Sequence, residues 1–284
     1  MVEMTATKPI AWRLYKLCGG VSDALGRIYG HARFTREVSE RDATLRRLTR
    51  ELYPDLTVSS GPFRGLKYTR QSSGSTLLPK LLGSYESELH PIFEELLAND
   101  YSTIVDVGCA EGYYAVGLGI RFPRAEVYAF DTASSARQLC TELAELNGIA
   151  ERVHVGAFCD AATLSEIPLG RKALIVSDCE GYEESLFTDQ VISKLAQHDL
   201  IVETHDFISI DISTKLRDRF ARTHRIRSIK STDDIEKAHT YHYDPIQKYD
   251  AATRRMILAE RRPAIMEWLV MTSKNANERN SHDR

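Results

Sequence analysis

The feature that most constrains the fold of this chain is an apolar run that ends in a turn containing glycine. Residues 104–112 read Ile-Val-Asp-Val-Gly-Cys-Ala-Glu-Gly, and a second apolar run over 127–130 ends at Asp131. Such runs are typical of buried parallel strands that present a ligand site at their carboxyl ends. Gly108 and Gly112 carry no Cβ, so a ligand can approach the turn closely. Asp131 is placed to accept hydrogen bonds from two ribose hydroxyls, and the pattern therefore predicts an adenosine-containing ligand.

The spacing of the turn separates two kinds of nucleoside ligand. A dinucleotide fingerprint needs Gly-x-Gly-x-x-Gly, but the second and third glycine positions counted from Gly108 hold Ala110 and Tyr113. The observed Asp-x-Gly-x-x-x-Gly followed by a later acid is instead similar to motif I of the Rossmann-like S-adenosylmethionine (SAM) methyltransferases. That resemblance implies that residues 106–112 hold the methionine part of SAM and Asp131 its ribose. A purely structural strand–turn–helix is the alternative.

The composition indicates an enzyme of a reducing compartment. The chain has 284 residues, 43% of them hydrophobic, which suffices for one large domain with an extension. The net charge is −3, with both signs mixed along the chain, so no binding of polyanions is expected. Five scattered cysteines show no disulfide or metal spacing. Residues 1–9 lack the character of a signal peptide, and no apolar stretch approaches the roughly 20 residues of a membrane span. We predict a cytoplasmic protein without a membrane partner.

We expect three segments along the chain. Residues 1–60 predict a helical extension, with a short amphipathic helix around 12–17 and a second apolar repeat over 38–52. These helices are candidates for a homodimer contact, or they cover the core domain. Residues 61–274 form the predicted catalytic domain, and 275–284 a disordered tail.

Within the predicted domain, helix and strand patterns alternate from Leu77 onward, which favours a doubly wound α/β sheet. We expect a Rossmann-like, seven-stranded, mostly parallel sheet whose last strand is antiparallel and lies at an edge. The expected strands are 103–107, 126–130, 152–157, 173–176, 200–202, 225–229 and 265–272. The expected helices include 87–99, 112–122, 134–147 and 213–223.

Polar residues cluster where the fourth and fifth expected strands end. The fourth is followed by Asp-Cys-Glu-Gly-Tyr-Glu over 178–183, and the fifth by Glu203, His205 and Asp206. Ligands of open α/β sheets lie outside the carboxyl ends of the strands, near the switch in strand order. Polar groups at the ends of apolar strands are also costly to bury without a purpose. These residues are therefore expected to carry the chemistry.

These strand ends extend the resemblance. Residues 178–183 resemble the Asp-Val-Glu-Gly-x-Glu motif of the FkbM family of SAM-dependent methyltransferases, and Val-Glu-Thr-His over 202–205 is similar to that family's acid-x-His. Leu-Leu-Gly-Ser-Tyr-Glu over 81–86 also looks like the helix entry of such enzymes. The resemblance covers about residues 60–274, with Cys179 as a mild departure. It implies methyl transfer from SAM, commonly to a hydroxyl of a sugar or other natural product.

Two mechanisms remain open for the acceptor site. In the first, His205 is the general base, because its unperturbed pKa lies near neutral, and Asp178 or Glu203 orients it. In the second, Asp178, Glu203 and His205, or Asp206, bind a divalent metal such as Mg²⁺ that lowers the pKa of the acceptor hydroxyl. A structural role for these residues is the third possibility.

Further residues complete the expected donor site. Asp160 is placed to bond the adenine amino group, although capping the helix that follows is an equal alternative. The resemblance puts Tyr85 and Glu86 near the methionine group. The predicted donor-binding residues are Tyr85, Glu86, Asp106, Gly108, Ala110, Gly112, Asp131, Thr132 and Asp160. Residues 240–245 are candidates for an acceptor lid or a plain surface loop, and the arginine pairs 254–255 and 261–262 for anion contacts or solvated helix charges.

Three classes of function follow from these patterns. The leading one is a SAM-dependent O-methyltransferase with a small-molecule or glycan acceptor. A nucleic-acid or protein methyltransferase is the second. The absence of net positive charge disfavours a nucleic-acid substrate, although residues 217–230 form a local basic run. A noncatalytic binding module with the SAM fold is the third, and an NAD-linked oxidoreductase is weakened by Ala110 and Tyr113.

Overall fold

The computed structural model describes residues 38–274. The chain divides between Leu52 and Tyr53 into two compact units. Of the first unit, the structure describes a helix over 38–52, where the apolar spacing predicts one. The expected helix around 12–17 and the expected tail over 275–284 lie outside the described residues.

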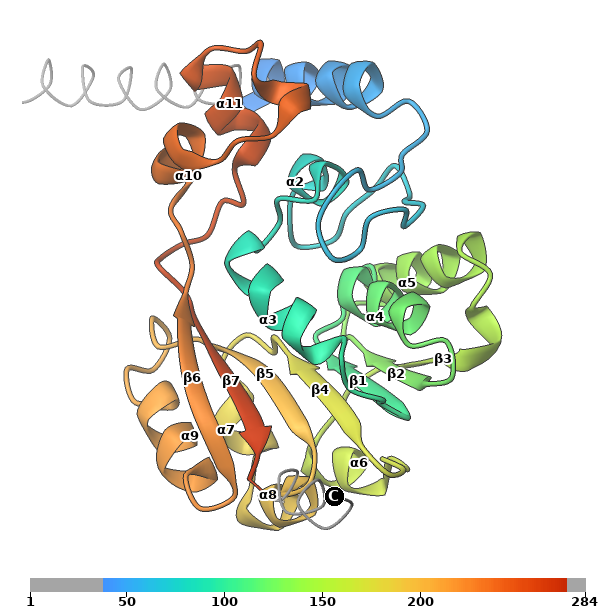
Figure 1. Ribbon diagram of the computed structural model, residues 1–284, viewed down its shortest axis with the longest axis vertical. Helices are drawn as coiled ribbons and strands as arrows, with labels where there is room; N and C mark the ends of the chain where they lie inside the picture. The colour runs from blue at the N-terminus through green and yellow to red at the C-terminus, as the bar shows by residue number, and fades with distance from the viewer. Residues whose placement is uncertain (1–37, 275–284) are drawn as a thin grey trace, which may run out of the picture. The chain divides into compact units, whose positions relative to one another are not determined.

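The second unit is built on one seven-stranded sheet (Figure 1). The strand order is β3-β2-β1-β4-β5-β7-β6, in which only the pairs made by β7 are antiparallel. The strands are β1 (Thr103–Val107), β2 (Glu126–Phe130), β3 (Val153–Gly156), β4 (Ala173–Ser177), β5 (Asp199–Thr204), β6 (His224–Lys230) and β7 (Glu267–Ser273). This confirms the expected Rossmann-like, mostly parallel sheet with an antiparallel last strand. The order reverses between β1 and β4, where such sheets bind ligands.

The expectation that the last strand lies at an edge is wrong, because β7 lies between β5 and β6. Its register pairs Leu200 with Met271 on one side, and β6 pairs with it on the other. Trp268, Leu269 and Val270 point alternately to both faces and are all buried, as in a central strand. At this end of the sheet the edge strand is β6, whose exposed arginines suit that position.

Helices cover both faces of the sheet (Figure 1). Helices α4 and α5 pack on β1, β2 and β3, while α6 to α9 enclose a core with the other face of the strands. The bounds are α2 (Leu77–Leu82), α3 (His90–Leu96), α4 (Tyr113–Arg121), α5 (Ser134–Leu146), α6 (Ala161–Glu166), α7 (Glu183–Leu186), α8 (Asp189–Leu195), α9 (Ile212–Phe220), α10 (Asp234–Thr240) and α11 (Ala251–Leu258). Three 3₁₀ turns are η1 (Ser87–Leu89), η2 (Ala150–Arg152) and η3 (Asp244–Ile246). Along residues 38–274, no helix combines the length and the apolar composition that a bilayer crossing requires.

Two departures from the expected elements bear on the site. The single helix expected over 87–99 is a 3₁₀ turn followed by α3, and Pro91 lies in the first turn of α3, where its missing N–H costs nothing. Between β6 and β7 the chain forms α10 and α11, which pack on each other, and α11 also contacts α2 (Figure 1). There the Thr76 hydroxyl donates to the carbonyl of Ala259 at 2.6 Å, which ties this insertion to the start of α2.

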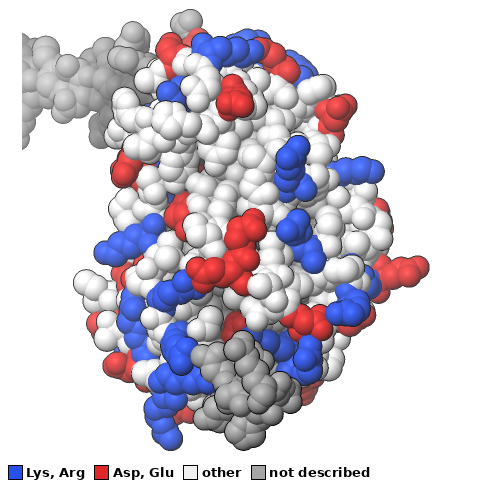
Figure 2. Space-filling view, in the orientation of Figure 1, with Lys and Arg blue, Asp and Glu red and all other residues white. Residues whose placement is uncertain are grey.

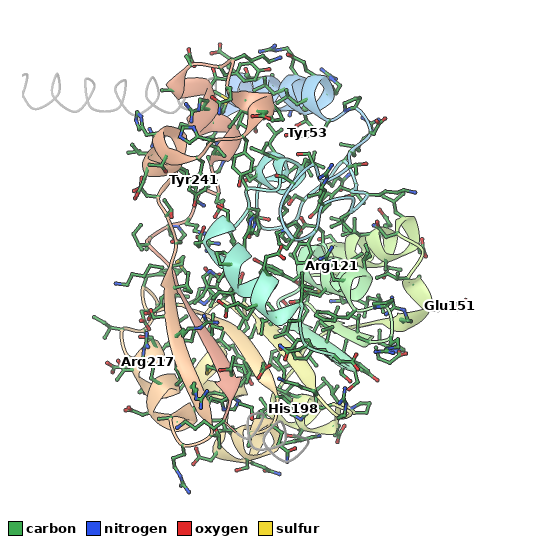
Figure 3. All side chains as sticks on the ribbon, viewed as in Figure 1. Tyr53, Arg121, Glu151, His198, Arg217 and Tyr241 are labelled. Atoms are coloured by element: carbon green, nitrogen blue, oxygen red, sulfur yellow. The ribbon has the colours of Figure 1, made fainter. Side chains whose placement is uncertain are left out.

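Two buried histidines stabilise the amino end of β5, where Figure 3 labels His198. Nδ1 of His198 accepts a hydrogen bond from the backbone N–H of Ala173 at 3.0 Å, and Nε2 of His224 lies 2.9 Å from the carbonyl of His198. Burial lowers the pKa of both imidazoles. The unfolded chain, in which the histidine pKa is about 6.5, therefore binds more protons than the folded chain once the pH falls below that value.

Above about pH 6.5 these histidines should not lower the free energy of unfolding. As the pH falls from there through their lowered pKa values, the free energy of unfolding should decrease. The double variant His198→Asn/His224→Gln keeps an acceptor and a donor at matching positions without an imidazole. It should lose part of the decrease between about pH 7 and 5, measured by urea unfolding. The exposed His239→Gln is the control. An identical pH slope in the double variant and the wild type contradicts this assignment.

Candidate active site

Two adjoining cavities lie at the carboxyl ends of the strands. The larger, of about 330 Å³, is lined by the turns that follow β1, β2, β3 and β4. The smaller, of about 110 Å³, is lined by the turns after β4 and β5 and by the segment before β7. The residues that border both are Gly74, Ser75, Tyr85, Asp178 and Glu180. The arrangement provides two compartments that meet at the end of β4.

Gly108 brings the turn after β1 against the turn after β4. Its φ is +87°, and a Cβ at this position would lie 1.7 Å from the carbonyl oxygen of Asp178. Ala110 also has a positive φ of 47° and lines the larger cavity. Gly112 does not line that cavity, and a Cβ there would lie 2.8 Å from Sγ of Cys140 on α5. The structure thus assigns Gly112 to the close packing of α4 on α5 rather than to ligand contact.

Asp131 fixes the turn and faces the larger cavity. Its Oδ2 accepts a hydrogen bond from the N–H of Ala110 at 2.9 Å, and its Oδ1 accepts one from the N–H of Ala133 at 2.8 Å. Thr132 lines the same cavity. A carboxylate has about four acceptor positions, so two backbone donors leave room for hydroxyl donors from the cavity. This is the geometry expected of a ribose-binding acid.

Asp106 is a buried carboxyl group with an unused oxygen. It lies on β1 with only 2% of its surface exposed, and it borders the larger cavity. Its Oδ2 has no hydrogen-bond partner among the described residues. Burial raises the pKa of Asp106 to about 8. A buried acceptor without a partner is costly, so a donor group in the cavity would stabilise it.

Two predicted donor-binding residues lie elsewhere. Asp160 is the N-cap of α6, where its Oδ1 accepts from the N–H of Thr163 at 2.8 Å, and it does not line either cavity. The capping alternative therefore describes Asp160 better than an adenine contact does. Glu86 is also outside both linings: it is buried and bonds Tyr114 and Arg262. Burial raises the pKa of Glu86 to about 7 against the opposing charge of Arg262.

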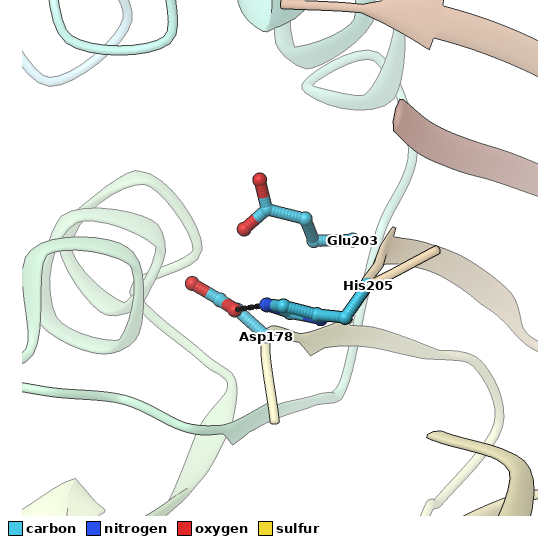
Figure 4. A group of neighbouring side chains, drawn as sticks. All are labelled: Asp178, Glu203 and His205. Carbon is cyan, nitrogen blue, oxygen red and sulfur yellow. Dashed lines mark ion pairs between the residues drawn. The ribbon is translucent and has the colours of Figure 1, made fainter. Parts of the chain in front are cut away.

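His205 lies between carboxylates at the end of β5. Its Nδ1 is 2.5 Å from Oε1 of Glu183, and its Nε2 is 3.3 Å from Oδ1 of Asp178 and 3.4 Å from Oε2 of Glu180. The ring itself is 2% exposed. Figure 4 shows Asp178 reaching His205 from the neighbouring strand end, with the carboxylate of Glu203 beside them. Glu183, which completes the motif after β4, thus fixes one ring nitrogen and leaves the other toward the cavity.

The surroundings of His205 change its expected chemistry. Burial lowers the pKa of His205, but the hydrogen bonds and charges of Asp178 and Glu183 outweigh burial and raise it to about 10. The imidazole therefore carries a proton at neutral pH in this arrangement. A protonated ring cannot accept the proton of an acceptor hydroxyl, so the expectation of a neutral His205 base is not supported. The sequence analysis placed Asp178 beside His205, but it used an unperturbed pKa and did not assign Glu183 to the ring.

Arg262 holds the opposite side of the smaller cavity. Its guanidinium makes ion pairs with Glu86, Glu203 and Glu260, the last at 3.0 Å from Nε. Its side chain is 14% exposed, so the expectation of a solvated helix charge is wrong for this residue. Burial, and next the charge of Asp178, raise the pKa of Glu203, while Arg262 opposes both. With three carboxylates around it, Arg262 is also poorly placed to bind an anionic acceptor.

The group Asp178, Glu203 and His205 has the spacing of a metal site. One ligand atom from each lies within 4.8 Å of the others. Two carboxylates and an imidazole suit a divalent cation, and Oδ1 of Asp178 faces Nε2 of His205 at 3.3 Å, so one cation could bind both. The donor set therefore fits a cation, although Arg262 already occupies Oε1 of Glu203. Asp206 is not part of the group, because its Oδ1 accepts from the N–H of Ser213 at 2.8 Å.

Sequence reasoning missed the ion pair of Lys80 and Glu111. Nζ of Lys80 lies 2.5 Å from Oε1 of Glu111, both side chains are buried, and Lys80 lines the larger cavity. Glu111 stands inside the glycine turn, and its charge at a position flanked by small residues was the available signal. None of the residues over 240–245, the candidate lid, lines either cavity.

Comparisons with known proteins add distant likenesses. No family model matches the chain, and no curated protein does either. A putative O-methyltransferase from Klebsiella pneumoniae is 10% identical, with a TM-score of 0.44 over 67% of this chain and 81% of its own. Geranyl diphosphate C-methyltransferase from Streptomyces coelicolor A3(2) is 12% identical, with a TM-score of 0.41 over 69% of this chain and 82% of its own. At such distances, function has to be argued from the residues of the site.

We expect Gly108→Ala to be far more damaging than Gly148→Ala. Both glycines have a positive φ, but a Cβ at Gly148 meets nothing within 4 Å, whereas at Gly108 it meets the backbone of Asp178. Gly148→Ala should cost about 1–2 kcal/mol for its left-handed backbone alone. Gly108→Ala should cost about 1–3 kcal/mol more, measured by urea unfolding, because the two turns must separate. Equal costs would contradict the close approach.

Proposed function

We propose that this protein is a SAM-dependent methyltransferase that acts on a hydroxyl of a small polar acceptor, such as a sugar or another natural product. The observation that carries the proposal is the meeting of the two cavities at Asp178. Methyl transfer needs a donor and an acceptor held in line on either side of one point, with water excluded. The larger cavity supplies the donor side and the smaller the acceptor side.

The larger cavity suits an adenosyl ligand. Its volume of about 330 Å³ is within the range of small-molecule sites. Asp131 has free acceptor positions for ribose hydroxyls, and the rings of Phe158 and Tyr182, 5.2 Å apart, provide an apolar wall near the end of β3. Ribose recognition and an aromatic contact are what an adenosyl group requires, and Asp178 lies where the sulfur-borne methyl must meet the acceptor.

The smaller cavity suits a neutral polyhydroxy acceptor better than an anion. Its lining includes the carboxylates of Asp178, Glu180, Glu203 and Glu260, which accept hydrogen bonds from hydroxyl groups. Phe207 contributes an aromatic face to the same lining. On the face that Figure 2 shows, basic and acidic side chains are interspersed, which does not favour a nucleic-acid partner.

The chemical step then divides between Asp178 and His205. As the C–O bond forms and the C–S bond breaks, the acceptor hydroxyl must lose its proton to a base. Asp178 borders both cavities, so we assign it the proton. His205 holds a proton on the ring nitrogen that faces Asp178 and thereby stabilises and orients that carboxylate. Glu183 fixes the ring from the other side.

A divalent cation is the second form of the same proposal. Asp178, Glu203 and His205 would hold it, and when bound it would lower the pKa of the acceptor hydroxyl. His205 would then have to give up its proton, because only a neutral imidazole binds a metal.

We expect His205→Ala to slow methyl transfer by about 100-fold or more while leaving donor affinity unchanged. The reason is that His205 touches Asp178 but does not line the larger cavity. Transfer of a labelled methyl group to a panel of sugars and natural-product alcohols measures the rate, and calorimetry with S-adenosylhomocysteine measures affinity. The exposed His242→Ala is the control. Unchanged turnover in His205→Ala removes this role, and failure of the wild type to bind S-adenosylhomocysteine overturns the proposed function.

We expect the metal form to be distinguishable by direct binding of Mn²⁺, followed by electron paramagnetic resonance. If the cation uses Asp178, Asp178→Asn should weaken Mn²⁺ binding at least about 10-fold, as loss of a ligand charge requires. Asp206→Asn is a matched control, because Asp206 lies beside His205 but bonds Ser213. Absence of Mn²⁺ binding by the wild type, together with activity that is insensitive to chelators, rejects the metal form.

A further inference from the structure

We propose that Lys80 binds the carboxylate at the amino-acid end of the donor, opposite Asp106, which the resemblance already puts at the methionine part and which would take the ammonium group. The inference rests on the proposed function and extends it, because Lys80 belongs to neither the glycine turn nor the strand ends. A zwitterionic group is recognised by one cation and one anion that a cavity holds at a fixed separation.

Lys80 is the one basic side chain among the described residues that line the larger cavity. The same lining contains four acids, which are Asp106, Asp131, Asp178 and Glu180. None of these acids attracts a ligand carboxylate, so Lys80 is the one favourable charged side chain for it among the described residues of this lining. The amino-acid end of an adenosyl donor must therefore turn toward α2, where Lys80 lies.

The ammonium of Lys80 is held in place before any ligand arrives. It donates to Oε1 of Glu111 at 2.5 Å and to Oγ of Ser75 at 2.6 Å. Its third contact, Oγ of Ser72 at 3.3 Å, is much longer, and Ser72 already bonds Glu111 at 2.7 Å. The third N–H is thus the one that a carboxylate in the cavity can take over. Ser75, which also borders the cavity, keeps the ammonium from moving away.

Two aromatic rings fix the direction of Lys80. Its Nζ lies 4.8 Å from the ring centre of Tyr85 and 5.5 Å from that of Tyr113. Tyr85 borders both cavities, so the carboxylate subsite lies near the junction. An adenosyl donor whose ribose is at Asp131 and whose carboxylate is at Lys80 must then pass its sulfur between them, beside Asp178.

Asp106 supplies the complementary partner. Its Oδ2 is buried, unpartnered among the described residues and borders the same cavity. A ligand ammonium can donate up to three hydrogen bonds, and one of them would satisfy this oxygen. Lys80 and Glu111 form a fully buried ion pair. Because an apolar pair of similar volume is often equally stable, stability alone does not explain why the chain has charged residues here.

The test compares three ligands by calorimetry: S-adenosylhomocysteine, its decarboxylated analogue and 5′-methylthioadenosine, which lacks the amino-acid end. Lys80→Gln should weaken S-adenosylhomocysteine about 10- to 100-fold, the range for a hydrogen bond to a charged group. The same variant should bind the decarboxylated analogue and 5′-methylthioadenosine as the wild type does. Lys172→Gln is a matched control, because Lys172 also pairs with an acid at 2.7 Å and lies over a tyrosine ring, yet does not line the cavity.

The outcomes separate the subsite from a structural role and from the proposed function. Equal weakening of all three ligands by Lys80→Gln overturns the carboxylate assignment, because a distorted cavity does not discriminate. If the variant folds poorly, Lys80→Gln/Glu111→Gln removes both buried charges and should show the same selective loss. Failure of the wild type to bind any adenosyl ligand overturns the proposed function itself. Normal binding of 5′-methylthioadenosine without preference for the carboxylate-bearing ligand overturns this inference alone.

Discussion

The close approach of Gly108 to the backbone of Asp178 is the constraint on which the site depends. A Cβ at that position would lie 1.7 Å from the carbonyl oxygen, so the two turns are in direct contact. β1 and β4 are neighbours at the point where the strand order reverses, and a ligand crevice forms outside their carboxyl ends at such a point. Contact between the turns puts Asp178 at the border of both cavities. A donor on one side and an acceptor on the other can then meet at one carboxylate.

Buried charge organises the rest of the site. Arg262 joins three glutamates from three segments of the chain, and Lys80 joins Glu111 to the serines before α2. Each network ties a segment outside the central sheet to a strand end. Taking these charges out of water is expensive, and the cost is offset only while every partner stays in place. The walls of both cavities are therefore expected to be rigid around their charged groups.

The sequence predicted what depends on local pattern. The bounds of β1 and β2 match the expected runs, and α5 begins where expected, at Ser134, because burial imposes a period that can be read directly. The place of β7 inside the sheet could not be read, because strand order depends on which apolar faces meet across long separations. Gly112 was expected to contact the ligand. In the structure it packs against Cys140, a residue of another helix that the local sequence pattern does not reveal.

The sequence allowed the residue types of the site to be predicted, but not their protonation states or charge partners. Asp178 and His205 were expected together, because parallel strands end at one edge of the sheet. The raised pKa of His205 arises from Glu183 and Asp178 acting on one ring, and the fixed charge of Arg262 comes from the insertion after β6. Such effects depend on distances between side chains, which no spacing in the sequence supplies.

A crystal structure of the protein with S-adenosylhomocysteine tests the central claim most directly. We expect the adenosyl group in the larger cavity, with its ribose hydroxyls about 2.7 Å from the carboxylate of Asp131, a normal hydrogen-bond length, and its sulfur facing Asp178 across the junction. A ligand bound elsewhere, or one whose sulfur points away from the smaller cavity, would contradict this expectation.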